Sequence, residues 1–455
     1  MAAISSARKA AFQILIAVER GQSHSDDLLR GKSVNLMSAP DRHLATTLVL
    51  GVLRWQIFLD NQLLALLKRP NAKLEPEIRI ALRMGAFQLL HLDRIPARAA
   101  IDESVELAKQ AGHRFASGMV NAVLRKLSSI PREDLPEGSP TELALAKAHP
   151  GWMVERWVDL YGLEAARAIC HHGQTQPVLT ARLAAPEVET ELSQAGVELQ
   201  PGELLTAARI VVHGDVNATT AFREGRVRMQ DEGSQLVGEI AASIGSDLDR
   251  EAKSILDMCA APGGKTLILA DRNHQARIVA CEASPQRLKQ LRDRLADHAA
   301  RVECRLADAT ALTEFTDVDL ALADVPCSGT GTLGRNPEIR HRLQIADLPR
   351  QADRQRKILS AALRALRPGG RVVYSTCSFE PEENEQVVAA VLAEDATVRQ
   401  NSLASRIKAL ADESVLTPSG ATKLQTSLTS DGALRLLPGV FHSDGFFIAM
   451  LEKSA

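Results

Sequence analysis

Two cysteines stand in surroundings that suit thiol chemistry. Cys327 lies in the segment ADVPCSG, and Cys377 lies in YSTCSF. Each segment follows a run of apolar residues typical of a buried strand, so both thiols are expected where a strand ends. A lone buried cysteine is usually a small apolar side chain. A pair, one beside Asp and Pro and the other between hydroxyl groups, instead favours a thiolate nucleophile assisted by a second thiol.

The elements that must hold this pair extend from about residue 222 to the C-terminus. Strands are predicted at SILDMC, ARIVACE, VECRLADA, VDLALADVP, GRVVYSTCS and GFFIAML, with amphipathic helices such as PQRLKQLRDRLADHA between them. This alternation predicts parallel strands joined by helical crossovers, an α/β doubly wound sheet. Ligands of such sheets bind beyond the carboxyl ends of the strands, where both thiols are expected.

A glycine-containing turn after the first of these strands indicates the ligand. The turn reads LDMCAAPGGKT, from Leu256 to Thr266. Cys259 occupies the position of the first glycine of a nucleotide-binding P-loop, and the dinucleotide pattern G-x-G-x-x-G is absent. Glu282, at the end of the second strand, can accept hydrogen bonds from both hydroxyls of a ribose, and Asp308, after the third strand, can meet an adenine edge. An adenosine ligand without a pyrophosphate remains, and S-adenosylmethionine fits best.

The composition restricts the class of protein. The chain has 455 residues, of which 45% are hydrophobic and 24% are charged, and this excludes a disordered or fibrous protein. Six cysteines without a CxxC pair argue against a structural zinc site and a disulfide scaffold, so we expect reduced thiols and no metal. The most apolar stretch, residues 46–67, contains Arg54 and Asp60, which argues against a membrane span. We therefore expect a cytoplasmic protein.

The chain divides into four segments by pattern and charge. Residues 1–130 repeat apolar positions at helical spacing, which predicts an all-α bundle. They carry 18 Lys and Arg against 11 Asp and Glu, a balance of +7, whereas the rest of the chain balances at −9. A basic segment of this kind favours a polyanionic partner. Residues 131–148 are predicted to be a linker, 149–221 a small α/β domain, and 222–455 the domain that carries the two thiols.

The two thiols and Asp324 together suit the methylation of a pyrimidine. Carbon 5 of the ring is a poor nucleophile, but a thiolate added to carbon 6 turns the ring into an enamine that can attack a methyl group. Asp324, three residues before Cys327, is expected near ring N3, where it would stabilise the charge developed on addition. The second thiol would assist the elimination that frees the product.

The segments LDMCAAPGGKT, ADVPCSGTGT and YSTCSFEPEENE resemble motifs of the RNA cytosine-C5 methyltransferases of the NOL1/NOP2/Sun family, and QDEGSQL and HSDGFFIAML resemble two more. The resemblance implies a Rossmann-like, S-adenosylmethionine-dependent methyltransferase domain with a mixed seven-stranded sheet. It implies Cys377 as the nucleophile and Cys327 as the thiol of product release. It also implies cofactor contacts by Cys259, Ala260, Ala261, Pro262, Gly263, Gly264, Lys265, Glu282, Arg287, Asp308 and Asp324. The family usually has Asp where this chain has Glu282.

The N-terminal segment extends the resemblance. IPARAAIDESVELAK and ASGMVNAVLRKL resemble NusB-like RNA-binding bundles. A NusB-like bundle ahead of this catalytic domain resembles the bacterial Sun-type branch of the family. That branch implies methyl transfer to carbon 5 of a cytosine in 16S ribosomal RNA through a covalent Cys–C6 adduct, with 16S rRNA or a small-subunit assembly intermediate as the partner of a monomer. Seven Lys and Arg against three acids between Arg335 and Lys357 favour phosphate contacts.

Two other functions fit parts of the sequence. A DNA cytosine-C5 methyltransferase would attack through Cys327, but it would also carry a Glu-Asn-Val motif, which this chain lacks. A non-catalytic RNA chaperone or assembly factor could keep the cofactor fold as a scaffold. The intact set of Asp324, Cys327 and Cys377 favours an enzyme over that scaffold.

Overall fold

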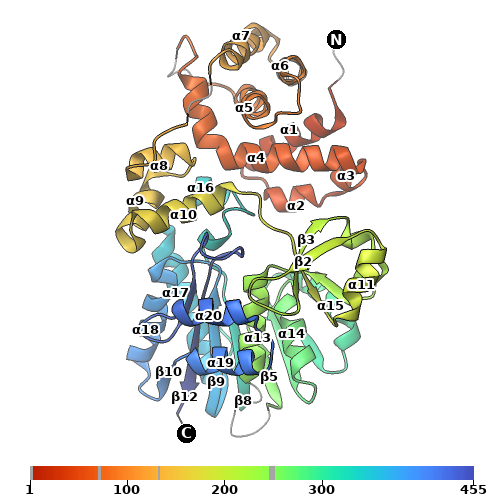
Figure 1. Ribbon diagram of the computed structural model, residues 1–455. Helices are drawn as coiled ribbons and strands as arrows, with labels where there is room; N and C mark the ends of the chain where they lie inside the picture. The colour runs from red at the N-terminus through yellow and green to blue at the C-terminus, as the bar shows by residue number, and fades with distance from the viewer. Residues whose placement is uncertain (1–3, 70–72, 132–133, 245–251, 455) are drawn as a thin grey trace. The chain divides into compact units, whose positions relative to one another are not determined.

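The computed structural model describes residues 4–69, 73–131, 134–244 and 252–454 (Figure 1). The chain folds into two compact units. The first contains Met1–Gln176 together with Leu333–Arg342, and the second contains Pro177–Thr332 together with Leu343–Ala455. The chain therefore leaves the second unit after Thr332 and re-enters it at Leu343.

The first unit is helical over its described residues. Its helices are α1 (Ser6–Glu19), α2 (Ser25–Leu29), α3 (Lys32–Asn35), α4 (Ala39–Leu64), α5 (Pro76–His91), α6 (Ala97–Gln110), α7 (Ser117–Ser128), α8 (Pro140–Ala146), α9 (Gly151–Tyr161), α10 (Leu163–Gln174) and α16 (Ile339–Arg342). The long helix α4 begins where the Ser38 side chain accepts a hydrogen bond from the backbone N–H of Asp41. A Cβ at Gly51 would lie 2.0 Å from the ring of Phe87, so glycine permits the close approach of α4 and α5.

Helices α8, α9 and α10 belong to the first unit, although the sequence placed them in other segments. Helix α8 falls inside the expected linker 131–148, and α9 and α10 fall inside the expected α/β domain 149–221. All three pack with the first unit. The buried side chains of Val154, Trp157 and Ile169 explain this membership, because they give these helices an apolar face that must be covered.

The segment Leu333–Arg342 is built into the first unit by its one fully buried arginine. Arg340 donates hydrogen bonds to the carbonyl oxygens of Arg54 and Ala148, each at 3.2 Å, and of Gly173 at 3.0 Å. Burial, with the nearby charge of Arg54, lowers the pKa of the Arg340 guanidinium to about 9. Arg340 also donates to the carbonyl oxygen of Leu333 at 3.4 Å. A buried guanidinium bonded to four carbonyl groups is not available to phosphate, so the expected phosphate contact is wrong for this arginine.

Other polar contacts hold the same segment. The Glu338 carboxylate accepts hydrogen bonds from the backbone N–H and the hydroxyl of Ser25 at 2.9 and 2.8 Å. Arg54 donates to the carbonyl oxygen of Gly334 at 2.7 Å, and the ring of His341 bonds the carbonyl oxygen of Leu53 at 2.7 Å. Each of these partners belongs to the first unit.

The second unit begins with a small antiparallel sheet. Its strands lie in the order β2–β3–β1–β4, with the helices α11 and α12 beside them. The elements are β1 (Thr180–Leu183), α11 (Glu187–Gln194), β2 (Glu198–Pro201), β3 (Ala208–His213), α12 (Thr220–Arg223) and β4 (Val227–Met229). The last strand of this sheet, β4, lies beyond residue 221, where the small α/β domain was expected to end.

The main sheet of the second unit has eight strands among the described residues. Seven lie in the order β10–β12–β9–β8–β5–β6–β7, and the short β11 pairs with β12, so β11 is an addition to the expected seven-stranded sheet. Strands β5 to β9 are parallel, and β12 runs antiparallel to β9. The strands are β5 (Ser254–Asp257), β6 (Arg277–Glu282), β7 (Val302–Leu306), β8 (Val318–Asp324), β9 (Leu366–Thr376), β10 (Val398–Asn401), β11 (Leu434–Leu436) and β12 (Phe446–Lys453).

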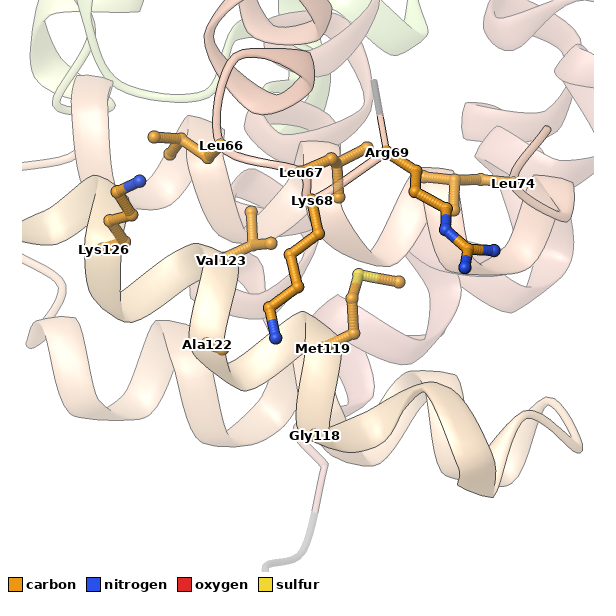
Figure 2. A pocket seen from close by; sticks show the side chains of 10 residues that line it. All are labelled: Leu66, Leu67, Lys68, Arg69, Leu74, Gly118, Met119, Ala122, Val123 and Lys126. Carbon is orange, nitrogen blue, oxygen red and sulfur yellow. The ribbon is translucent and has the colours of Figure 1, made fainter. Parts of the chain in front are cut away.

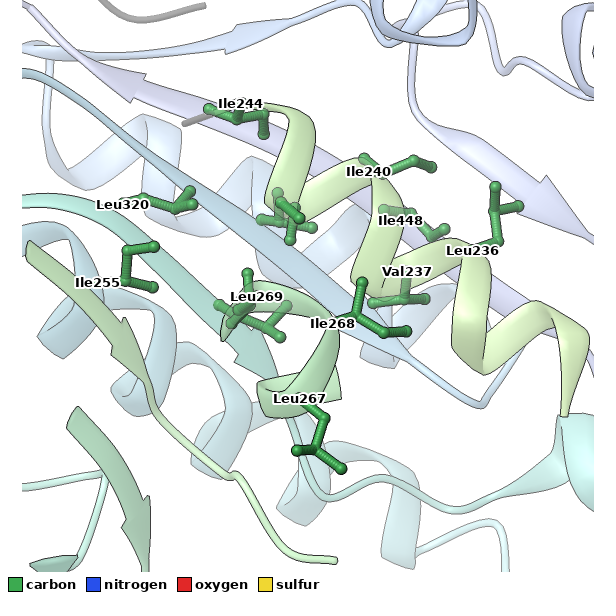
Figure 3. Packing of buried hydrophobic residues seen from close by; sticks show 14 of the residues in the cluster. Leu236, Val237, Ile240, Ile244, Ile255, Leu267, Ile268, Leu269, Leu320 and Ile448 are labelled. Atoms are coloured by element: carbon green, nitrogen blue, oxygen red, sulfur yellow. The ribbon is translucent and has the colours of Figure 1, made fainter. Parts of the chain in front are cut away.

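Helices cover both faces of this sheet. One face packs against helices that include α13 and α14 (Figure 3), and the other packs against α17 and α18. Alternate residues of β8 supply the two layers: Leu320 and Leu322 face the first layer, and Ala321 and Ala323 face the second. The helices are α13 (Glu232–Ile244), α14 (Gly264–Arg272), α15 (Pro285–Arg294), α17 (Asp347–Ala365), α18 (Glu385–Glu394), α19 (Ala404–Asp412) and α20 (Pro418–Thr426).

Candidate functional site

The two thiols of the sequence analysis meet at the carboxyl ends of adjacent strands. Strands β8 and β9 are parallel neighbours, and Asp324 pairs with Ser375 in their register. The chain continues three residues past Asp324 to Cys327 and two past Ser375 to Cys377. The two Sγ atoms lie 3.3 Å apart, within hydrogen-bonding distance for sulfur. The parallel register therefore brings together two cysteines that are 50 residues apart in the sequence.

Asp324 is the last residue of β8, three residues before Cys327, and is held as a hydrogen-bond acceptor. Its Oδ2 accepts from the Lys265 ammonium at 2.6 Å, and its Oδ1 accepts from the Ser375 hydroxyl at 2.8 Å. Burial alone would lower the pKa of Lys265, but the charge of Asp324 and its hydrogen bond outweigh burial, so that pKa is raised. The Lys265 ammonium also lies 5.5 Å from the centre of the Phe446 ring. Lys265, expected as a cofactor contact, thus supports the carboxylate next to the thiols.

The surroundings of Cys327 favour the protonated form of its thiol. Its hydrogen bond to Cys377, its burial, and the charges of Cys377 and Glu383 all raise the pKa of Cys327 well above its ordinary value. The 3.3 Å separation lets this thiol donate to a Cys377 thiolate. The geometry thus suits one sulfur as nucleophile and the other as hydrogen-bond donor.

The glycine-containing turn lies at the end of β5 and leads into α14. Gly263 has φ +98°, in the left-handed region that favours glycine, and a Cβ there would lie 3.0 Å from the side chain of Leu291. Arg287, on α15, donates to the carbonyl oxygen of Ala261 at 2.8 Å and thereby braces the turn. A Cβ at Gly264 would meet the Gln230 side chain at 3.1 Å. Both glycines therefore let the turn pack closely against the side chains of Leu291 and Gln230.

The two acids expected to contact an adenosine follow the next two strands. Glu282 is buried at the end of β6, and its Oε1 accepts the backbone N–H of Ser284 at 2.8 Å. Asp308 follows β7, is exposed, and accepts from the backbone N–H and the hydroxyl of Thr310, which lower its pKa. These carboxylates, the left-handed glycine and the start of α14 fit the ribose, adenine and amino-acid groups of S-adenosylmethionine.

The thiols near the glycine-containing turn have another environment. Burial, with the charge of Asp257, raises the pKa of the Cys281 thiol to about 12, and burial also raises the pKa of Cys259. Asp257 is buried, accepts a hydrogen bond from the Thr266 hydroxyl at 2.7 Å, and has its pKa raised by burial to about 7. Neither thiol has the partner that Cys327 and Cys377 give each other.

Three buried polar residues that were not predicted from the sequence contact residues next to the two cysteines. Glu383 and Asn384 lie in the segment EPEEN that follows Cys377, and Gln355 lies on α17. All three are fully buried. In the sequence, EPEEN has the composition of an exposed acidic loop, so only its position after a strand-end cysteine could have marked it.

The first unit carries a hollow of about 670 Å³ (Figure 2). Leu67, Met119 and Val123 belong to its apolar lining, and Lys68 and Lys126 add positive charge. Its lining includes no carboxylate among the described residues. Within the described part of the chain, no group of three or more His, Cys, Asp or Glu side chains could hold a metal ion, and no helix is long and apolar enough to cross a membrane.

Comparisons with known proteins agree with this geometry. Residues 248–452 match the family model described as 16S rRNA methyltransferase RsmB/F, and residues 5–129 match the NusB family. The chain is 34% identical to the "Probable ribosomal RNA small subunit methyltransferase B" of Bacillus subtilis (strain 168), over 98% of this chain and 99% of that protein.

Two solved structures share the fold. The crystal structure of PH0851 aligns with 99% of this chain and 100% of its own at a TM-score of 0.79 and 22% identity. The structure of NSun6 from Pyrococcus horikoshii with SFG aligns with 66% of this chain and 97% of its own at a TM-score of 0.54 and 19% identity. S-adenosylmethionine is the cofactor of this methyltransferase family, and the turn and the acids described above fit it. On the strength of these matches, the chain belongs to the RsmB/F family of ribosomal RNA small subunit methyltransferases.

Proposed function

We propose that this protein methylates carbon 5 of a cytosine in 16S ribosomal RNA and that it does so through a covalent bond between Cys377 and carbon 6 of the ring. One observation carries the proposal. The sulfurs of Cys327 and Cys377 lie 3.3 Å apart, and Asp324, the last residue of β8, accepts a hydrogen bond from Ser375 of β9, so all three groups lie where these two strands end and one nucleobase could meet them.

Cys377 supplies the nucleophile. Its thiolate adds to carbon 6, the carbon 5–carbon 6 double bond opens, and carbon 5 becomes an enamine carbon. When bound, S-adenosylmethionine supplies the electrophilic methyl group that carbon 5 of the activated ring takes up. The turn from Cys259 to Lys265, with Glu282, Arg287 and Asp308, would hold that cofactor.

Cys327 assists the release of the product. A general base takes the proton from carbon 5, the electrons of that C–H bond re-form the carbon 5–carbon 6 double bond, and the bond between carbon 6 and the Cys377 sulfur breaks with its electrons returning to the sulfur. The Cys327 thiol, 3.3 Å away, can donate a hydrogen bond to the departing sulfur and so stabilise the charge that it regains. The raised pKa of Cys327 supports this role, because the thiol stays protonated.

Asp324 orients the base and favours cytosine over uracil. Lys265 and Ser375 fix its carboxylate as an acceptor, and a carboxylate accepts from the exocyclic amine of cytosine. Uracil has a carbonyl oxygen at that position and would face the carboxylate with a second acceptor. The same carboxylate lies near ring N3 in this pose and stabilises the protonated form of the adduct. The target base must be unpaired or flipped for a thiol to reach carbon 6.

The NusB-like segment is proposed to bind the RNA. Its match to the NusB family, its excess of 18 Lys and Arg over 11 Asp and Glu, and the cationic hollow beside Lys68 and Lys126 support this assignment. The partner would be 16S ribosomal RNA, either naked or in a partly assembled small subunit.

Two cysteine substitutions test the proposal. The protein would be incubated with labelled S-adenosylmethionine and with 16S RNA, naked or in partly assembled subunits, and the products separated under denaturing conditions. Cys377→Ala is expected to abolish both methyl transfer and the covalent RNA adduct, whereas Cys327→Ala is expected to accumulate the adduct. Cys281→Ala serves as a matched thiol control and should behave as the parent protein.

Three results would contradict the proposal. Adduct accumulation in Cys377→Ala with loss of adduct in Cys327→Ala would assign the attack to Cys327, as in the DNA enzymes. A methyl group mapped to another atom of the RNA would exclude carbon 5 chemistry. Cofactor binding without methyl transfer to either form of 16S RNA would favour a non-catalytic assembly factor.

A further inference from the structure

The loop that carries Cys327 is held on both sides of the cysteine. Before it, the carbonyl oxygen of Pro326 accepts a hydrogen bond from Gln355 at 3.0 Å. After it, Ser328 donates to the Glu383 carboxylate through its backbone N–H at 2.7 Å and also through its hydroxyl. Gln355 donates to the same carboxylate at 3.0 Å, which joins the two sides of the loop.

Asn384, the residue after Glu383, holds the loop that carries Cys377 in the same way. The Asn384 side-chain oxygen accepts from the hydroxyl of Thr376 at 2.6 Å, and its amide donates to the carbonyl oxygen of Ser378 at 3.0 Å. These two residues flank Cys377 directly. Asn384 therefore fixes the second cysteine from both sides, as Glu383 and Gln355 fix the first.

The turn that contains both residues is itself rigidly placed. Glu383 and Asn384 are each 0% exposed. The backbone carbonyl of Glu383 accepts from the hydroxyl of Tyr374, a buried residue of β9. A fully buried carboxylate is costly unless its acceptor sites are used, and here Ser328 and Gln355 use them. One turn thus sets the position of both loops, and with it the distance between the two sulfurs.

We propose that Glu383 and Asn384 are separate positioning residues for the two thiols: Glu383, with Gln355, places Cys327 for product release, and Asn384 places Cys377 for attack. The inference rests on the roles proposed above for the two cysteines. It predicts opposite kinetic defects from two adjacent side chains. A role in stability alone would give both substitutions the same defect.

The test measures adduct and turnover for three variants of the full-length protein. Glu383→Gln keeps the size of the side chain but places an amide against Ser328, and Gln355→Met removes both hydrogen bonds of that side chain. Both variants are expected to accumulate the covalent RNA adduct while turnover falls by about 100-fold, the loss that a small misplacement of a reacting group can cause. Asn384→Ala is expected to form the adduct about 100-fold more slowly and not to accumulate it.

Controls separate this inference from the proposed function and from misfolding. Cys327→Ala must accumulate the adduct in the same assay, because its failure to do so would overturn the proposed function itself. The affinity for S-adenosylmethionine and the melting temperature check that each variant is folded. If Cys327→Ala accumulates adduct but folded Glu383→Gln and Gln355→Met do not, the inference is wrong. It is equally wrong if Asn384→Ala accumulates the adduct.

Discussion

The ends of β5 and β6 and the ends of β8 and β9 present the same residue types in two environments. Each pair of strands carries two cysteines near its carboxyl ends, and each has a buried or half-buried aspartate on its first strand. Around β5 and β6, the thiols are surrounded by core and their pKa values are raised chiefly by burial. Around β8 and β9, the two sulfurs are each other's neighbours, with Asp324 held by Lys265 beside them.

This difference separates the proposed reactive cysteines from cysteines that only pack in the core. Residue type and place at a strand end are common to both pairs, so neither decides the chemistry. The β8/β9 pair differs in its support, since buried polar groups hold both loops that carry the thiols. The four predictions below test whether the two pairs of strands have separate functions.

The largest expected effect is on methyl transfer when a thiol is removed from each pair. Cys377→Ala should lower kcat by at least about 10⁴-fold, as removal of a covalent nucleophile does in other enzymes. Cys281→Ala should leave kcat close to that of the parent protein, because its sulfur lies in the core. Initial rates with saturating RNA measure both. Equal losses in the two variants would erase the distinction between the pairs.

The second largest expected effect is on kcat when the aspartate of each pair is replaced. Asp324→Asn should lower kcat by about 10³-fold, because an amide can turn a donor toward the base and no longer balances the Lys265 ammonium. Asp257→Asn keeps the size of a carboxyl that bonds only within the cofactor turn, and its kcat should change far less. Single-turnover kinetics with a preformed RNA complex provide the measurement. A larger loss in Asp257→Asn would move the reacting centre toward β5.

The affinity for the cofactor should depend on the β5/β6 pair and not on the β8/β9 pair. Glu282→Ala should weaken binding of S-adenosylmethionine by roughly 10- to 100-fold, the value of one or two hydrogen bonds to a charged group. Cys377→Ala should bind the cofactor as the parent protein does, because its side chain lies at the other pair of strands. Isothermal titration calorimetry without RNA compares the two. An unchanged affinity in Glu282→Ala would show that this longer side chain does not reach the ribose.

The smallest expected effect concerns the pH dependence of stability. The pKa of Asp257 is raised to about 7 in the folded protein, mainly by burial, from an ordinary value of 3.8. The folded state therefore holds a proton that the unfolded state has lost between these values, and stability falls as the pH rises through this window. Between pH 5 and pH 8 the free energy of unfolding should fall by roughly 2 kcal/mol more in the parent protein than in Asp257→Asn. Urea unfolding at the two pH values tests this, and parallel curves for the two proteins would contradict it.

Local pattern predicted the parts of the fold that depend on local sequence. The strands that became β5, β6, β7, β8, β9 and β12 were evident from apolar runs bounded by turns, and the carboxyl-end rule placed Cys327 and Cys377 at one edge. The exact pairing of β8 with β9 and the 3.3 Å between the sulfurs depend on tertiary contacts, which no single segment encodes.

The features that the sequence analysis missed depend on distant partners. Residues 400–430, rich in Ser, Thr and Ala, have the composition of a surface insertion of unclear conformation, yet α19 and α20 bury Ile407, Leu410 and Leu424 in the main core. Glu383 and Asn384 have side chains typical of a solvated loop, and their burial follows from distant parts of the fold that pack over them. In the same way, the sequence around Arg340 does not predict that backbone carbonyl groups of distant residues accept its hydrogen bonds.

The anchored segment Leu333–Arg342 has a consequence for anyone who dissects this protein. A fragment that starts at residue 177 would contain this segment but lack the carbonyl groups of Arg54, Ala148 and Gly173 that Arg340 uses. No single cleavage yields two self-sufficient pieces, because the chain threads out of one unit and back. Excision of the catalytic part by simple truncation would leave this arginine-bearing segment without its partners after the Pro-Cys loop, so a minimal enzyme would need the segment replaced by a short connection.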